Sequence, residues 1–481
     1  MSFEQPLRVS PPRTPGRPAA RIGRTSRRRL LQTAVAVPGF AALGLLASPT
    51  AFAEDERHGT DGRKWAASWA AAAHGPYPSG NAVAQPELKF AFPSPETGAQ
   101  DQTFRLVVRP TLWGDRFRLR FTNVFGTQPI TIDGVFIGLH ASAGAVASGT
   151  NRPVSFGGGH GRLTLPAGHS AYSDSVELRP GTDLSSRLLI GRKLAVSFHV
   201  VGSSGPMTWH AKAMQTSYVT APGAGTHGSE ESDTAFPYST TSWYFLDALD
   251  ALAPADMAVV AALGDSITDG TGSTLNGDDR WPDVLARRLH AVYGNRVSVV
   301  NEGIGGNQIL GPATYTPQNP FSGGPAALQR LDRDVFGLSG LSAIIFLEGI
   351  NDLGSANASA EAVIGGIQEL VRRVRAHGGL KIVGATLTSS LNSTNVAYGT
   401  PDVNQRRQTI NAFIRTSGIF DSVADFDAVT VDPQTGELRP EFQPNSTTAT
   451  IDRLHPNRAG YLAMGQAVDL RVLAPASAAA T

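Results

Sequence analysis

The chain has 481 residues, of which 41% are hydrophobic and 17% charged, a composition that indicates a folded protein long enough for two domains. It contains no cysteine, which excludes disulfides, thiol catalysis and cysteine-ligated zinc. Eight of the 41 basic residues lie in the first 29 positions beside a single acidic residue, so the rest of the chain carries 33 basic and 39 acidic residues. That balance provides no basic footprint for nucleic acid, and no nucleic-acid partner is expected.

The first predicted element is an export signal. The segment SRRRLLQ at residues 26–32 leads into an uncharged apolar stretch, residues 30–47, and AFA follows at residues 51–53. This pattern resembles a twin-arginine export signal that is cleaved after Ala53. The alternative is an uncleaved membrane anchor, because the apolar stretch is close to the length that spans a bilayer. We expect a signal at residues 1–53, a secreted or cell-surface protein, and no stable membrane span after the signal is removed.

A charged linker is expected at residues 54–63, and period-two patterns follow it. In RFRLRF, residues 116–121, the apolar side chains Phe117, Leu119 and Phe121 alternate with three arginines, as in a strand with one wet face. The segment KLAVSFHVV at residues 193–201 repeats the alternation, and clusters of glycine, proline, serine and asparagine separate such runs. We therefore predict an antiparallel β-sandwich or jelly-roll-like domain over residues 64–245.

Four large side chains of this region have two interpretations. They either line a sugar-binding surface or pack in the core and between domains, which is the commoner fate of large aromatic residues. They are Trp65, Trp69, Trp209 and His210.

The spacing of apolar residues changes in the second part of the chain, where continuous apolar runs replace the period-two alternation. Apolar runs of strand length occur at residues 257–263, 297–300, 343–347, 382–385 and 423–424. Segments with a helical pattern alternate with them, at residues 279–293, 326–336, 360–377, 402–416 and 457–472. This alternation predicts an α/β domain with a three-layer, flavodoxin-like parallel sheet over residues 246–475, followed by a disordered tail at residues 476–481.

Polar motifs follow the predicted strands. LGDSITDG, residues 263–270, begins where the first apolar run ends, which makes Ser266 a candidate nucleophile at the carboxyl edge of the sheet. NEGIGGN at residues 301–307 and GIND at residues 349–352 follow later strands, and DRLHP at residues 452–456 precedes the last helix. We expect the four motifs to converge on one edge of the sheet.

These residue types match the requirements of acyl transfer. A serine hydroxyl becomes a strong nucleophile only when an imidazole takes its proton, and His455 can serve as that base for Ser266. Asp452 can accept the other ring N–H and fix the tautomer. The backbone N–H groups of Ser266 and of a glycine in residues 303–306, with the side-chain amide of Asn351, would form an oxyanion hole.

The motifs GDSITDG, NEGIGGN, GIND and DRLHP, in this order, resemble the four blocks of the SGNH, or GDSL, hydrolase superfamily over residues 258–473. The resemblance implies the SGNH hydrolase fold. It also implies roles for the matching positions: Ser266, Asp452 and His455 as the catalytic residues, and Ser266, Gly306 and Asn351 as the oxyanion donors, with Gly305 as the alternative to Gly306. The whole chain is similar to a secreted actinobacterial arylesterase/acylhydrolase subfamily associated with xylan-degrading gene clusters.

Other acidic residues near the motifs have different interpretations. Asp265 and Asp269 are expected to hold their loop through backbone hydrogen bonds. Glu348 and Asp352 could form a glycosidase pair, but that would leave the serine, histidine and aspartate unexplained. The histidines lack a spacing such as HExxH, so neither a metal nor a cofactor is predicted.

The sequence thus predicts an exported serine esterase that hydrolyses carboxylic esters through an acyl-enzyme. The expected substrate is a short-chain ester or a carbohydrate O-acetyl group, with acetylated polysaccharide or lipid as the ester donor. One alternative is a lipase or lysophospholipase of the same superfamily, and another is a secreted carbohydrate-binding protein with an inactive hydrolase domain. The loops at residues 310–325 and 389–401 are expected to carry substrate contacts.

Overall fold

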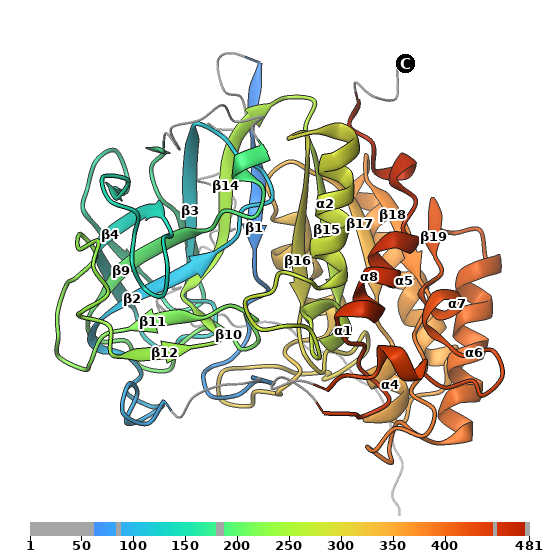
Figure 1. Cartoon of the computed structure of the whole chain (residues 1–481). Helices are drawn as coiled ribbons and strands as arrows, with labels where there is room; N and C mark the ends of the chain where they lie inside the picture. Colours follow the sequence, from blue (N-terminus) through green and yellow to red (C-terminus); the bar gives the residue numbers. More distant parts are fainter. Residues whose placement is uncertain (1–61, 83–87, 179–186, 446–449, 477–481) are drawn as a thin grey trace, which may run out of the picture. The chain divides into compact units, whose positions relative to one another are not determined.

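The computed structural model describes residues 62–82, 88–178, 187–445 and 450–476 (Figure 1). The predicted export signal, nearly all of the predicted linker and the predicted tail after residue 476 lie outside the described residues. Within the described part of the chain, no helix combines the length and the apolar character needed to cross a membrane.

The described residues between 62 and 254, here called the β half, form antiparallel sheets. One sheet has the order β1-β14-β3-β7, with β8 also paired to β3, and another has the order β12-β11-β2-β9-β4-β5, with β6 also paired to β4. A short third sheet pairs β10 with β13. The strands are β1 (Arg63–Ala70), β2 (Gln100–Val108), β3 (Arg116–Thr122), β4 (Ile130–Leu139), β5 (Arg152–Pro153), β6 (Arg162–Leu165), β7 (Ser170–Tyr172), β8 (Val176–Glu177), β9 (Leu194–Ser203), β10 (Trp209–His210), β11 (Ser217–Val219), β12 (Tyr238–Thr240), β13 (Trp243–Tyr244) and β14 (Leu246–Pro254).

The two larger sheets share an aromatic core. Phe121 of β3 meets Phe198 of β9 edge-to-face with ring centroids 5.2 Å apart, and Phe198 stacks on Phe104 of β2 at 5.3 Å. These rings are fully buried. The apolar face predicted for residues 116–121 therefore joins the sheets, and the predicted antiparallel architecture of this region is confirmed.

The opposite face of β3 differs from the prediction. Arg120 is only 9% exposed, and its Nε donates to Asp247 Oδ1 at 2.7 Å, while Arg118 Nε donates to Asp250 Oδ2 at 2.9 Å. Arg120 also donates to the carbonyl of Gly337, which lies in the second half of the chain. Arg116, at the start of β3, is exposed as predicted, whereas carboxylates of the neighbouring strand β14 pair with Arg118 and Arg120 and allow the rest of this face to be covered.

The large aromatic residues of the β half mostly pack in its interior. Trp69 meets Trp243 edge-to-face with ring centroids 4.8 Å apart, and Trp209 stacks on Tyr244. Trp69, Trp209 and His210 are buried, which confirms packing rather than a sugar-binding surface for these three residues. Trp65 is partly buried beneath the guanidinium of Arg118, which lies 4.7 Å from its ring.

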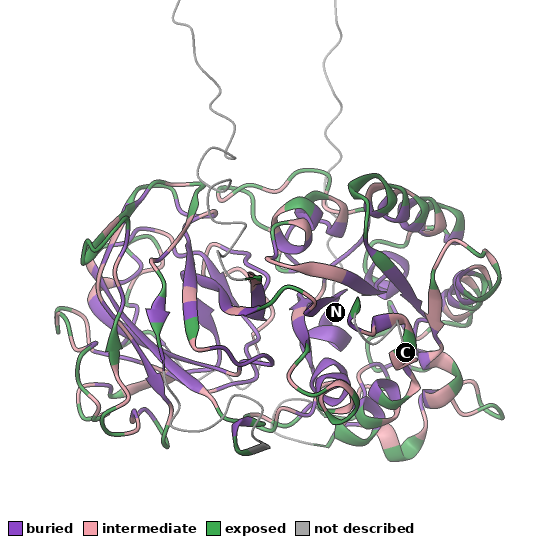
Figure 2. Cartoon of the chain, turned by 90° about the horizontal axis from the view of Figure 1, so that it is seen from above, coloured by how far each residue is buried: buried purple, intermediate pink, exposed green. Residues whose placement is uncertain are grey.

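The described residues between 255 and 476, here called the α/β half, contain a five-stranded parallel sheet in the order β16-β15-β17-β18-β19. Helices lie on both sides of this sheet (Figure 2). Helix α2 packs with α8, and α5 packs with α6. The predicted parallel, flavodoxin-like sheet is confirmed. The strands are β15 (Ala258–Gly264), β16 (Val297–Gly303), β17 (Leu341–Leu347), β18 (Lys381–Ala385) and β19 (Ser422–Ala424). The helices are α1 (Ser266–Asp269), α2 (Trp281–Tyr293), α3 (Ala327–Leu331), α4 (Ile350–Gly354), α5 (Ala360–His377), α6 (Pro401–Thr416), α7 (Phe426–Thr430) and α8 (Arg458–Ala467).

Two of the predicted helices are interrupted. The helix predicted at residues 326–336 is divided into α3 and a π-helical turn, Asp332–Phe336, in which the Gly337 N–H donates to Asp332 O. The helix predicted at residues 457–472 ends at Ala467 because Val468 is extended, and Asp469 then caps a separate 3-10 turn, Leu470–Leu473.

The β half packs on the edge of the parallel sheet. Ala71, which follows β1, forms a parallel bridge to Asn301 of β16, and Ser298 Oγ donates to Ala67 O at 2.6 Å. Strand β14 follows the domain boundary predicted after residue 245, and it pairs with both β1 and β3. One continuous hydrophobic core includes residues of both halves, and buried segments run through both in Figure 2.

Candidate active site

Ser266 is the first residue of the one-turn helix α1, directly beyond strand β15. Asp265 caps this helix, because its Oδ1 accepts the N–H of Ile267 at 2.9 Å. Gly264 ends the strand, and a Cβ there would lie 2.1 Å from Thr268 Oγ1, so only glycine permits this tight strand-to-helix connection. Ser266 is 8% exposed at the carboxyl edge of the parallel sheet, the edge that the sequence predicted.

The structure brings the three predicted catalytic residues together. Ser266 Oγ lies 2.8 Å from His455 Nε2, and His455 Nδ1 lies 2.6 Å from Asp452 Oδ2. The second carboxylate oxygen of Asp452 accepts the backbone N–H groups of Leu454 and His455, each at 2.9 Å. With Nδ1 donating to the carboxylate, Nε2 can accept the serine proton.

Asp452 is held in its ionised form. Burial by itself raises the pKa of Asp452, but the hydrogen bonds from the His455 ring and from two backbone N–H groups outweigh it and hold the pKa below its ordinary value. The carbonyl of Asp452 accepts from Ser393 Oγ at 2.8 Å and from the Thr394 N–H at 3.1 Å. The loop at residues 389–401 therefore holds the backbone that carries the carboxylate.

The backbone N–H groups of Gly305 and Gly306, the two candidate oxyanion donors of this loop, differ in their hydrogen-bond partners. The N–H of Gly305 donates to Asp269 Oδ2 at 2.8 Å, so Asp269 accepts a backbone hydrogen bond from the loop that carries Gly305, whereas the sequence predicted that it would hold its own loop. The N–H of Gly306 makes no hydrogen bond to another described residue, and Gly306 has a φ of +85° that favours glycine. Of the two glycines considered from the sequence, the geometry favours Gly306 as a donor to substrate.

Asn351 lies in α4, at the end of strand β17, with its side-chain amide fixed at both ends. Its Nδ2 donates to the carbonyl of Asn307 at 2.8 Å, and its Oδ1 accepts from the hydroxyl of Tyr398 at 2.9 Å. Because the Asn307 carbonyl can only accept, the nitrogen must face it, and the second N–H of Nδ2 is left for another acceptor. Sequence reasoning missed Tyr398, since a single tyrosine in a predicted loop carries no motif signal.

The other acidic residues around the motifs have structural partners. Glu348 pairs with the fully buried Arg330 at 3.1 Å, and the Asp352 carboxylate accepts the N–H groups of Ile309 and Leu310. Burial raises the pKa of Asp352 to about 6 and that of Asp265 to about 7. Glu348 and Asp352 are both buried and already bonded, which disfavours the glycosidase interpretation.

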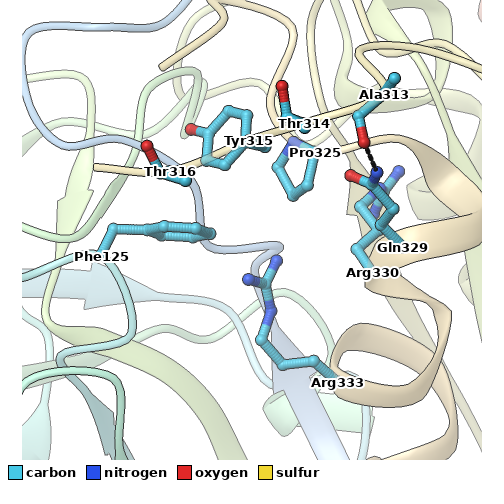
Figure 3. A pocket seen from close by; sticks show the side chains of 9 residues that line it. All are labelled: Phe125, Ala313, Thr314, Tyr315, Thr316, Pro325, Gln329, Arg330 and Arg333. Carbon is cyan, nitrogen blue, oxygen red and sulfur yellow. Dashed lines mark hydrogen bonds between the residues drawn. The ribbon is translucent and has the colours of Figure 1, made fainter. Parts of the chain in front are cut away.

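A cavity of about 440 Å³ lies where the loop at residues 310–325 meets the β half (Figure 3). Tyr315 and Phe125 meet edge-to-face with ring centroids 5.2 Å apart, and the Tyr315 hydroxyl donates to the carbonyl of Gly75 at 2.5 Å. The lining residues are Phe125, Ala313, Thr314, Tyr315, Thr316, Pro325, Gln329, Arg330 and Arg333. None of the predicted catalytic or oxyanion residues lines this cavity, so the loop packs on the β half outside the triad. Over the described ranges, no group of three or more histidine or acidic side chains is arranged to hold a metal.

The sequence model of the GDSL-like lipase/acylhydrolase family matches residues 262–463, a range that includes the four motifs. No curated protein matches the chain. Among solved structures, the chain is similar to a carbohydrate acetylesterase family member from Sinorhizobium meliloti, with 20% identity, a TM-score of 0.35, and coverage of 45% of this chain and 99% of that one. It is similar to the native aryl esterase of M. smegmatis, with 17% identity, a TM-score of 0.35, and coverage of 45% of this chain and 100% of that one. It is also similar to a GDSL-like lipase from Bacteroides thetaiotaomicron VPI-5482, with 18% identity, a TM-score of 0.32, and coverage of 45% of this chain and 88% of that one. Residues 262–463 therefore form a GDSL-like lipase/acylhydrolase domain, and this match supports a carboxylic ester hydrolase.

Proposed function

We propose that this chain is an exported serine esterase that acts on short-chain carboxylic esters, including O-acetyl groups of carbohydrates. The observation that carries the proposal is the chain of hydrogen bonds from Ser266 Oγ to His455 Nε2, at 2.8 Å, and from His455 Nδ1 to Asp452, at 2.6 Å. Its order and lengths suit proton transfer from the serine to the imidazole.

In the first half of the reaction, His455 Nε2 takes the proton of Ser266 while Oγ attacks the ester carbonyl. The carbonyl oxygen gains charge, and it would be met by the N–H groups of Ser266 and Gly306 and by Nδ2 of Asn351. When the tetrahedral intermediate collapses, the C–O bond to the alcohol breaks and His455 returns the proton to the leaving oxygen. The acyl group remains on Ser266.

In the second half, His455 takes a proton from water, and the resulting hydroxide equivalent attacks the acyl-enzyme in the same oxyanion hole. Collapse releases the carboxylic acid, and the proton returns to Ser266 Oγ. Asp452 stays ionised throughout and stabilises the imidazolium that forms twice in each cycle.

One feature supports a small acyl group. Ser266 is only 8% exposed, so access to its side chain is restricted. Export rests on the sequence alone, on the arginine pair and the apolar segment that precede Ala53.

The test of the substrate class compares p-nitrophenyl esters from acetate to palmitate, together with acetate release from acetylated xylan and fatty-acid release from phospholipids. We expect rates to fall steeply as the acyl chain lengthens, with acetate released from the polysaccharide. A preference for long chains would instead identify a lipase or lysophospholipase. The Ser266→Ala variant is the control, and it should lose turnover and labelling by a fluorophosphonate.

An inactive hydrolase domain predicts a different result. A carbohydrate-binding protein of that kind would bind polysaccharide, hydrolyse no ester and resist the fluorophosphonate. Full activity of Ser266→Ala would overturn the mechanism itself. For export, replacing Arg27 and Arg28 with lysine should keep the protein inside the producing cell, and the N-terminus of the exported wild-type protein should be Glu54; export of the lysine variant at the wild-type level would count against the signal.

A further inference from the structure

The peptide that joins Gly305 to Gly306 is contacted by a side chain of the β half. Asn81, which follows β1 in the chain, donates from Nδ2 to the carbonyl of Gly305 at 2.5 Å. The carbonyl of Gly305 and the N–H of Gly306 belong to one planar trans peptide, so they point in opposite directions. A hydrogen bond that fixes the direction of the carbonyl therefore also fixes the direction of the N–H.

The same hydrogen bond changes the strength of the donor. An amide whose carbonyl accepts a hydrogen bond is polarised, and its N–H becomes a better donor at the other end. The Asn81 amide is neutral and brings no charge into the site. Its effect on an oxygen bound by Gly306 is thus to orient and strengthen one N–H group.

The N–H of Gly305 is held by a carboxylate of α1 that a side chain of the β half contacts in turn. The N–H of Gly305 donates to Asp269 Oδ2, and Asp269 Oδ1 lies 3.2 Å from Nε2 of His210. His210 is buried, with its Nδ1 2.9 Å from the carbonyl of Ala72. The ring therefore links the Asp269 carboxylate to the backbone that leads from β1 toward Asn81.

A buried lysine of the β half also lies beside Gly305. Lys212 donates from Nζ to Thr271 Oγ1 at 2.5 Å, and its Nζ would be 2.8 Å from a Cβ placed on Gly305. A Cβ on Gly306 would be 2.5 Å from Asn81 Nδ2. Side chains of the β half thus lie beside both glycines, and a larger residue at either position would have to displace Lys212 or Asn81.

We infer that the β half completes the active site, and that Asn81 is a positioning residue that aims the Gly306 N–H at the carbonyl oxygen of the substrate. The inference rests on the proposed function, because it assumes that Gly306 donates to an oxyanion. It assigns the β half a part in catalysis beyond packing or carbohydrate binding. Asn81 acts through the peptide and does not contact the reacting atoms.

The test uses the full chain with two substitutions at one position. Asn81→Ala removes the donor, and Asn81→Asp places a carboxylate against the Gly305 carbonyl in nearly the same volume. We expect Asn81→Ala to lower kcat on p-nitrophenyl acetate by about tenfold, less than the loss of an oxyanion donor itself, with KM changed by less than about twofold. Asn81→Asp should lower kcat further, because the negative carboxylate then repels the Gly305 carbonyl oxygen and turns the peptide away from its productive direction.

The matched control is Asn151→Ala. Asn151 also lies in the β half, and its Nδ2 donates to the carbonyls of Gly228 and Ser229 at 3.1 and 3.2 Å. Fluorophosphonate labelling run to completion counts the folded sites in each variant, so kcat can be expressed per competent site. A purely structural role of Asn81 would lower the number of labelled sites or Tm. The positioning role lowers the rate of labelling and kcat per site instead.

The inference would be overturned if both Asn81 variants kept the wild-type kcat per labelled site, or if Asn151→Ala lost as much. The outcome is distinguishable from failure of the proposed function. Ser266→Ala should abolish turnover in either case, so an active Ser266→Ala protein refutes the esterase mechanism. If Ser266→Ala is inactive but both Asn81 variants keep the wild-type kcat per labelled site, only the positioning role is refuted.

Discussion

Replacing Asn351 with alanine removes a proposed oxyanion donor, whereas replacing Tyr398 with phenylalanine removes only a group that holds it. The Asn351 amide is held by two bonds, from Nδ2 to the Asn307 carbonyl at 2.8 Å and from the Tyr398 hydroxyl to Oδ1 at 2.9 Å. Tyr398→Phe breaks the second bond and leaves the first. The amide nitrogen therefore stays on the side of the Asn307 carbonyl, with its second N–H still available.

The magnitudes follow from these contacts. Loss of one oxyanion donor raises the barrier by about 2.7–4 kcal/mol, a factor of about 10²–10³ in kcat, and this is the expectation for Asn351→Ala. Loss of one neutral hydrogen bond between buried groups costs about 1 kcal/mol. If all of that loss appears in the transition state, Tyr398→Phe should lower kcat by about fivefold. The two variants should thus differ by at least about tenfold in kcat.

The assay is steady-state hydrolysis of p-nitrophenyl acetate, with the active-site concentration taken from fluorophosphonate titration and Tm measured in parallel. The titration separates slower chemistry from a smaller folded fraction. An Asn351→Ala protein within about tenfold of the wild-type kcat would refute the donor role, since loss of an oxyanion donor typically lowers kcat by about 10²–10³. Equal losses in both variants at unchanged Tm would refute the assignment of Tyr398 as a holding residue.

Three further substitutions test the surroundings of the site. Asp247→Ala leaves the buried Arg120 without its carboxylate, so the free energy of unfolding should fall by about 3–5 kcal/mol in urea titrations, and a loss below about 1 kcal/mol would contradict the pairing. Burial raises the pKa of Asp265 to about 7, so the folded state keeps a proton that the unfolded state has released above about pH 4, and this contribution to stability is lost as pH rises toward 7. Asp265→Asn cannot ionise, so its free energy of unfolding should gain about 2.5 kcal/mol relative to wild type between pH 5 and pH 8, whereas a constant difference would argue against the raised pKa. Gly306→Ala places a Cβ 2.5 Å from Asn81 Nδ2 at a φ of +85°, so kcat should fall by at least about tenfold, and adding Asn81→Ala should lower it little further if the two changes act on the same peptide.

The α/β half followed from the sequence because its signals are local. Each strand is a short apolar run, and the first three motifs lie at the ends of such runs, so the carboxyl edge of the sheet could be placed without tertiary information. The predicted bounds of the helix at residues 360–377 agree with α5, and β15 is shifted by one residue from the predicted run at residues 257–263. The residues predicted to form the triad lie in hydrogen-bonding contact, 189 positions apart for Ser266 and His455.

The β half was predicted less completely, for a physical reason. Period-two alternation separates two faces of a strand but does not say what covers the polar face. The sequence predicted that Arg118 and Arg120 face solvent, because their partners Asp250 and Asp247 lie more than 120 positions later in the chain. Charge pairing across strands is a tertiary property, and no local pattern reports it.

The same limit explains which site residues escaped sequence reasoning. Tyr398 and Asn81 belong to no motif, and each acts on a motif residue through a single hydrogen bond. Asn81 and Gly305 are 224 positions apart, so only the packing of the β half on the α/β half brings them together. Motifs identify groups that meet the substrate, whereas the groups that orient them can come from any nearby element.

The attachment of the β half to strand β16 explains how such a distant residue can be placed to a fraction of an ångström. An edge strand exposes unpaired N–H and C=O groups, and β16 is the edge strand of the parallel sheet on this side. The bridge from Ala71 to Asn301 and the bond from Ser298 Oγ to Ala67 O cover part of that edge. Strand β16 continues directly into the oxyanion loop, and β1 continues toward Asn81, so the contact that protects the sheet edge also sets the distance between Asn81 and Gly305. An interface that drifted by an ångström would keep the triad, which lies wholly within the α/β half, but would release the Gly305–Gly306 peptide.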